Sequence, residues 1–171
     1  MILPAVRDPR LVSVRRGGTL TETDHRLLAI WAAMCAEHVL PLFEQSNSED
    51  KRPRIAIEAA RMWARGQAKM MDTRARGGHA MGAARPLLGA ARFAAYAAGQ
   101  AACVAHVAEH DLGAAAYAIK AVQAAAPRGK EKEAGQTERD WQRRHIPGGL
   151  YRLVLEDQAR RNDICWSVFS D

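Results

Sequence analysis

The amino-acid sequence predicts an all-α fold, a single-domain bundle of about six to seven helices that follows a short irregular N-terminal segment at residues 1–20. Alanine, the residue with the highest helix propensity, occupies 34 of the 171 positions. It dominates residues 94–126, where almost nothing favours a strand. Apolar residues elsewhere recur at three- and four-residue steps, as on one face of a helix. We therefore expect one Ala-rich helical domain over residues 21–171, with closely packed helix axes.

The N-terminal segment and the first helix are separated by a capping signal. Residues 1–20 look irregular, with a short extended piece at 11–14. Thr21 is expected to cap a helix that runs to about Phe43, because its hydroxyl can accept a hydrogen bond from a free backbone N–H. Glu22 and Asp24 in the first turn suit the positive end of the helix dipole.

The second helix opens at Pro53, a residue that fits the first turn, and ends at Gly66. One of its faces is charged, at helical spacing, with Arg54, Glu58, Arg61, Arg65 and Lys69. Such a face is usually a solvated surface held by salt bridges. The alternative is a partner-binding surface, and we take these five residues as the candidate.

The remaining helices follow from Gly, Pro and cap signals. A third helix begins near Lys69, and its three glycines, each costing about 1 kcal/mol relative to Ala, predict an irregular second half. Pro86 opens a fourth helix to about Val107, and a fifth covers 111–125 before Pro127. Residues 128–136 predict a charged linker, Thr137 caps a sixth helix over 138–145, and a seventh covers 150–161. The apolar tail, 164–169, is expected to dock on the bundle.

Charge and cysteine content limit the function classes. The net charge of +6 is compatible with an acidic protein partner. Nucleic-acid binding is disfavoured, because the arginines are spread along the chain and the signature motifs are missing. Three widely spaced cysteines without a C-x-x-C motif indicate a reduced, cytoplasmic protein. Neither a signal peptide nor a membrane span is expected, and the Ala-rich faces suit a homodimer interface or a monomer core equally well.

One short motif suggests metal chemistry. His106, Glu109 and His110 fit the H-x-x-E-H pattern, in which both imidazoles share one helical face and the Glu acts as a base. A metal-dependent hydrolase or nuclease centred on 106–110 is therefore one hypothesis. No third ligand stands out, and no strands are predicted for the larger α/β domain of such enzymes. We favour histidines hydrogen-bonded within the bundle, with no cofactor and no catalytic residue.

An ordered set of short segments carries a family resemblance. It includes Arg15-Arg16-Gly17-Gly18-Thr19-Leu20 and Cys165-Trp166-Ser167, with further segments at 8–12, 24–29, 35–43, 52–59, 105–107 with 110, 112–115, 138–142, 157–158 and 161–162. With these, the chain resembles the Imm-5-like immunity proteins of bacterial polymorphic toxin systems. The resemblance implies a small helical cytoplasmic protein that binds and neutralises a cognate toxin, and it supplies no catalytic residues. His106 and His110 match it, whereas Glu109 is not a fixed element.

Overall fold

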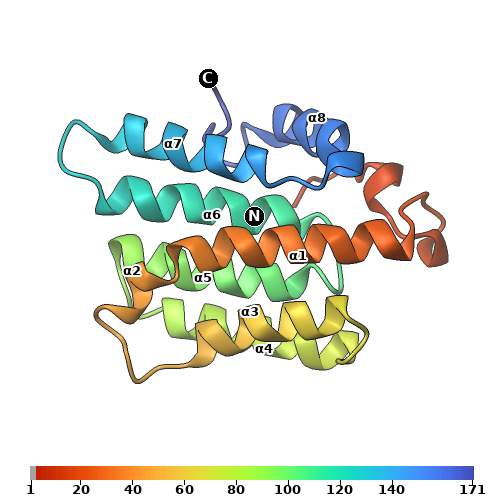
Figure 1. Ribbon diagram of the computed structural model, residues 1–171, viewed down its shortest axis with the longest axis horizontal. Helices are drawn as coiled ribbons and strands as arrows, with labels where there is room; N and C mark the ends of the chain where they lie inside the picture. Colours follow the sequence, from red (N-terminus) through yellow and green to blue (C-terminus); the bar gives the residue numbers. More distant parts are fainter. Residues whose placement is uncertain (1–2) are drawn as a thin grey trace.

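The structure is a computed structural model that describes residues 3–171 (Figure 1). Within these residues it contains seven helices of 11 or more residues and no strand: α1 (Glu22–Val39), α3 (Arg52–Ala64), α4 (Met70–Ala84), α5 (Gly89–Cys103), α6 (His110–Ala125), α7 (Glu131–Arg144) and α8 (Tyr151–Arg161). The shorter helices are α2 (Pro41–Glu44), η1 (Pro9–Leu11), η2 (Val14–Arg16) and η3 (Gly148–Leu150). The predicted all-α bundle is confirmed.

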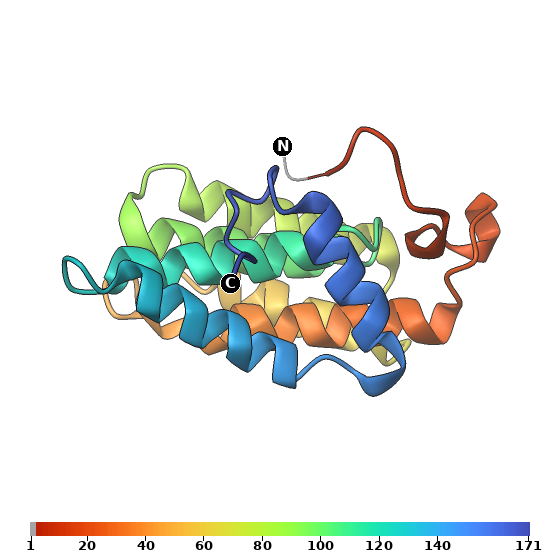
Figure 2. The same cartoon turned by 90° about the horizontal axis from the view of Figure 1, so that it is seen from above.

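The long helices other than α8 follow the long axis of the molecule, and α8 runs across their direction (Figure 1 and Figure 2). α5 is central, since α1, α3, α4 and α6 all pack against it, and α7 covers the outer side of α6. The core between them is built largely of alanines, together with Leu28, Trp31, Leu112 and Ile119. Small side chains in these positions let the helices approach closely.

α1 begins as predicted. The Thr21 hydroxyl accepts a hydrogen bond from the Asp24 N–H at 3.1 Å. The helix ends at Val39, four residues earlier than expected, and Pro41 starts the separate turn α2. Proline has no N–H to continue the hydrogen-bond ladder, which explains the interruption.

The stretch Glu22–Glu44 is long and apolar enough to cross a membrane by length and composition, with a mean hydropathy of 1.4. The sequence did not lead us to expect such a stretch. In the bundle, its Leu28, Trp31 and Cys35 side chains are fully buried. The core helix of a folded bundle needs the same apolarity, so this packing accounts for the composition.

The prediction that the second half of the third helix is irregular is wrong, because α4 is continuous through its glycines. A Cβ atom on Gly77 would lie 2.7 Å from the Gly99 carbonyl oxygen of α5 and 2.8 Å from Cys103 Sγ. Such distances leave no room for a side chain. The glycine therefore allows α4 and α5 to pack closely, and this packing compensates for the low helix propensity.

Two neighbouring alanine substitutions in α4 should have opposite effects on stability. Gly77→Ala is expected to lower the free energy of unfolding by about 1–3 kcal/mol through overpacking. Gly78, with no atom within 4 Å of its hypothetical Cβ, should gain about 0.5–1 kcal/mol on substitution by Ala. Urea denaturation of both variants and of wild type measures these changes in the free energy of unfolding. Equal effects at the two positions would contradict close packing at Gly77.

The predicted charged linker at 128–136 is wrong, because α7 already begins at Glu131. Glu131 and Glu133 lie in its first turn, where the helix dipole favours negative charge. Gly135 is buried against the Gln123 side chain of α6, so this part of the predicted linker packs on the bundle as helix. Thr137 is no cap, since its hydroxyl donates to the Glu133 carbonyl within the helix.

The N-terminal segment from residue 3 onward and the C-terminal tail both pack on the bundle. The expected extended piece at 11–14 is instead the junction between η1 and η2, where Ser13 forms an isolated bridge with Leu20. α5 begins at Gly89, so Pro86 lies in the loop before it rather than opening it. The tail docks as predicted, with Cys165, Val168 and Phe169 buried.

Candidate functional site

The H-x-x-E-H segment does not lie on one helix. α5 ends at Cys103 and α6 starts at His110, so residues 104–109 form the turn between them. The N–H groups of His106 and Val107 both bond to the Cys103 carbonyl, and His110 N bonds to the Val107 carbonyl. The prediction that both imidazoles share a helical face is therefore wrong. Long-range ion pairs of Glu109, described below, hold this turn where local propensity favours helix.

The two histidines line different cavities. His106 lies with Arg15, Arg16, Glu22, His25 and Trp63 around a cavity of about 420 Å³, and its Nδ1 is 3.3 Å from Met70 Sδ. His110 lines a second cavity, of about 430 Å³, and its Nδ1 is hydrogen-bonded to Gln100 Oε1 at 2.7 Å. Burial lowers the pKa of His110 to about 4. Among residues 3–171, no three His, Cys, Asp or Glu side chains gather closely enough to hold a metal ion.

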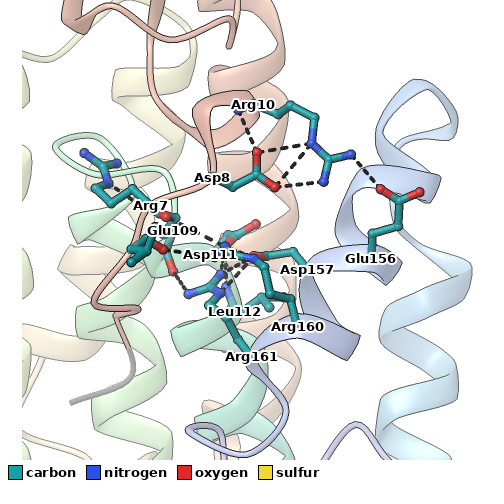
Figure 3. A network of polar contacts seen from close by, with 11 residues as sticks. Arg7, Asp8, Arg10, Glu109, Asp111, Leu112, Glu156, Asp157, Arg160 and Arg161 are labelled. Carbon is teal, nitrogen blue, oxygen red and sulfur yellow. Dashed lines mark hydrogen bonds and ion pairs between the residues drawn. The ribbon is translucent and has the colours of Figure 1, made fainter.

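Glu109 belongs instead to a buried network of three carboxylates (Figure 3). Its Oε2 accepts a hydrogen bond from Arg7 Nε at 2.5 Å, and its Oε1 lies 3.9 Å from Arg160 Nη2. That Oε1 is buried and accepts no hydrogen bond from the described part of the chain. The contact with Arg7 ties the N-terminal segment to the turn between α5 and α6.

Arg161 is the centre of the network and is only 1% exposed. Its guanidinium donates to Asp157 Oδ2 at 2.5 and 2.9 Å, to the Glu109 carbonyl at 2.8 Å and to Asp111 Oδ1 at 3.2 Å. Burial raises the pKa of Asp111 to about 7, while the charge of Arg161 opposes this shift. The guanidinium thus joins α8 to the start of α6 and to the preceding turn.

Sequence reasoning missed this network. Asp157 is only 1% exposed, although aspartate is a residue type that is mostly found at the surface. Asp157 and Arg161 are four residues apart on α8, which marks them as a helical ion pair. Nothing local shows that the pair is buried, or that Asp111 joins it from 46 positions away. Among the partners from residues 3–171, Arg160 and Arg7 are partly solvent-exposed.

Two cations of the charged face that was predicted to bind a partner are already engaged in ion pairs within the chain. Arg54 makes a two-bond pair with Glu44, and Arg61 makes one with Glu37, so both cations bind α3 to its neighbours α2 and α1. Glu58 and Arg65 are exposed. Lys69 lies beyond the turn at Gly66, immediately before α4, and is not on the α3 face. The five residues therefore do not form one helical stripe.

The three cysteines are buried and free of disulfides. Burial raises the pKa of each thiol, and that of Cys165 to about 11. The thiols are therefore protonated near neutral pH and are poor nucleophiles.

Comparison with known proteins places this chain in a family. The model of the family described as "Imm-5 like putative immunity protein" matches residues 18–148, from the turn before α1 to the start of η3. No curated protein and no solved structure matches the chain. The matched span covers well over half of the sequence and agrees with the resemblance of its short segments, and the chain belongs to the Imm-5 like immunity protein family.

Proposed function

We propose that this chain neutralises one cognate toxin by binding it, without catalysing a reaction. The observation that carries the proposal is the family match over residues 18–148. Immunity by binding requires a stable surface rather than a reactive site. The bundle fits this requirement, because the long helices pack on one continuous core.

The contacts of the candidate chemical groups support binding over hydrolysis. His106 and His110 point to different cavities, and Glu109 is engaged by Arg7. The H-x-x-E-H segment thus lacks the convergent geometry that a catalytic zinc requires. The buried thiols have raised pKa values and do not supply a nucleophile.

The net charge supports a partner with an acidic surface, and the free cysteines support a cytoplasmic location. A net charge of +6 steers association with an acidic toxin surface more readily than with a basic one. Free cysteines without a disulfide suit the reducing cytoplasm. Most alanines of α5 and α6 are buried in the core of one copy of the chain, which supports the monomer-core alternative.

The test is capture of the partner from the cells that make this protein. The tagged chain is purified, and bound proteins are identified by mass spectrometry. The proposal expects one stoichiometric partner that stops growth when expressed alone and is harmless when co-expressed with this chain. A chain that captures no such partner, and that instead carries a stoichiometric metal and hydrolyses a substrate, would refute it.

A further inference from the structure

Four aromatic side chains from three parts of the chain meet on the outside of the bundle. Tyr117 of α6 is central, with its ring centroid 5.1 Å from that of Tyr96 and 6.3 Å from that of Phe93, both on α5. Trp166, which follows α8, packs edge-on against Tyr117 at 5.0 Å. The three α5 and α6 rings are partly buried, and Trp166 is 46% exposed. We call these four residues the aromatic patch.

The backbone holds Trp166 outward at a conformational cost. Trp166 and Ser167 have φ values of 57° and 56°, the left-handed region that bulky residues rarely adopt. Such residues cost about 1–3 kcal/mol each and persist only where the surroundings impose them. Here Asn162 imposes them, because its carbonyl accepts from Ser167 N at 2.7 Å and its Oδ1 accepts from Phe169 N at 3.0 Å. Strain of this kind often marks a functional position.

The patch also carries two cations. The Arg92 guanidinium lies 5.6 Å from the centre of the Tyr96 ring, and Lys120 Nζ lies 5.8 Å from that of Phe93. Neither forms an ion pair with any residue from 3 to 171, unlike Arg54 and Arg61 on α3. Cations without a carboxylate partner are available to an acidic surface, and aromatic residues with arginine are the side chains that dominate binding energy at interfaces.

We propose that the aromatic patch, with Arg92 and Lys120 at its side, is the surface that binds the toxin. The inference rests on the proposed function and names its interface. The toxin presents carboxylates to the two cations and an apolar hollow that receives Trp166. The patch replaces the α3 face as the candidate surface, since Arg54 and Arg61 are already paired within the chain.

The test compares Trp166→Ala with Tyr151→Ala, an aromatic truncation outside the patch at the same 46% exposure. Binding to the purified toxin identified by the capture experiment is measured by calorimetry. Trp166→Ala should weaken binding roughly 30-fold, the fold-change of a strong interface residue, and Tyr151→Ala less than threefold. The double variant Arg92→Glu/Lys120→Glu, which breaks no ion pair among residues 3–171, should weaken binding at least tenfold, and more so at low salt.

Circular dichroism and thermal unfolding confirm that each variant is folded. If wild type binds the toxin and neither Trp166→Ala nor the double variant changes affinity, the inference is wrong while the proposed function stands. If Arg65→Glu on the α3 side weakens binding instead, the interface lies there and the patch is excluded. If the capture experiment finds no toxin, and the chain instead carries a stoichiometric metal and hydrolyses a substrate, both proposals are overturned together.

Discussion

Arg161→Met should lower the free energy of unfolding by about 3–5 kcal/mol, the largest effect expected from a single substitution in this chain. The guanidinium is fully buried and donates to Asp111, to Asp157 and to the Glu109 carbonyl. Removing it leaves two carboxylates buried beside each other without a cation at the centre. Methionine fills a similar volume, so the loss reports on charge rather than on a cavity. Urea denaturation followed by circular dichroism gives the value.

The matched control is Arg160→Met, one residue earlier on α8. Arg160 also pairs with Asp157, at 2.5 Å, but its side chain is 34% exposed. Exposed ion pairs contribute about 0–1 kcal/mol, and Arg161 still neutralises Asp157 in this variant. The control should therefore lose at most about 1 kcal/mol. A similar loss for the two variants would show that Arg161 is not the centre of the network.

The stability of the protein should depend on His110 between pH 6.5 and pH 4. Burial, and the positive charges of neighbouring side chains, lower its pKa from 6.5 to about 4; those neighbours are His106, Arg161, Arg74 and Arg7. In this window the unfolded chain binds a proton at His110 that the folded chain does not. Acid therefore favours unfolding. Through His110 alone, the free energy of unfolding should be at its full value above pH 6.5 and about 3 kcal/mol lower at pH 4.

His110→Gln isolates this effect from the carboxylates, which titrate in the same range. The glutamine amide can still donate to Gln100 but does not titrate. The free energy of unfolding of wild type, minus that of the variant, should be constant above pH 6.5 and decline below it. A difference that stays flat down to pH 4 would mean that His110 is protonated in the folded protein.

Much of the helical fold could be predicted from local signals. The Thr21 cap, Pro53 in the first turn and Pro127 after the fifth helix act within a few residues of their own positions, and α1, α3 and α6 begin or end near them. The family could be recognised for the same reason, because its ordered short segments are properties of the chain. The candidate site was less predictable: the spacing of His106 and His110 indicated a shared face that the turn at 104–109 removes.

The sequence by itself determined an all-α chain, the positions of most helices and the family. Tertiary structure decided the rest, because contacts between distant residues outweigh local propensity. Gly77 weakens a helix in isolation, yet α4 is regular because Gly77 packs against Gly99. Arg7 and Arg161 come from opposite ends of the chain, and they engage Glu109 in a turn whose composition favours helix. Propensity acts over one turn, whereas a buried charge is stabilised only by the partner that the fold brings to it.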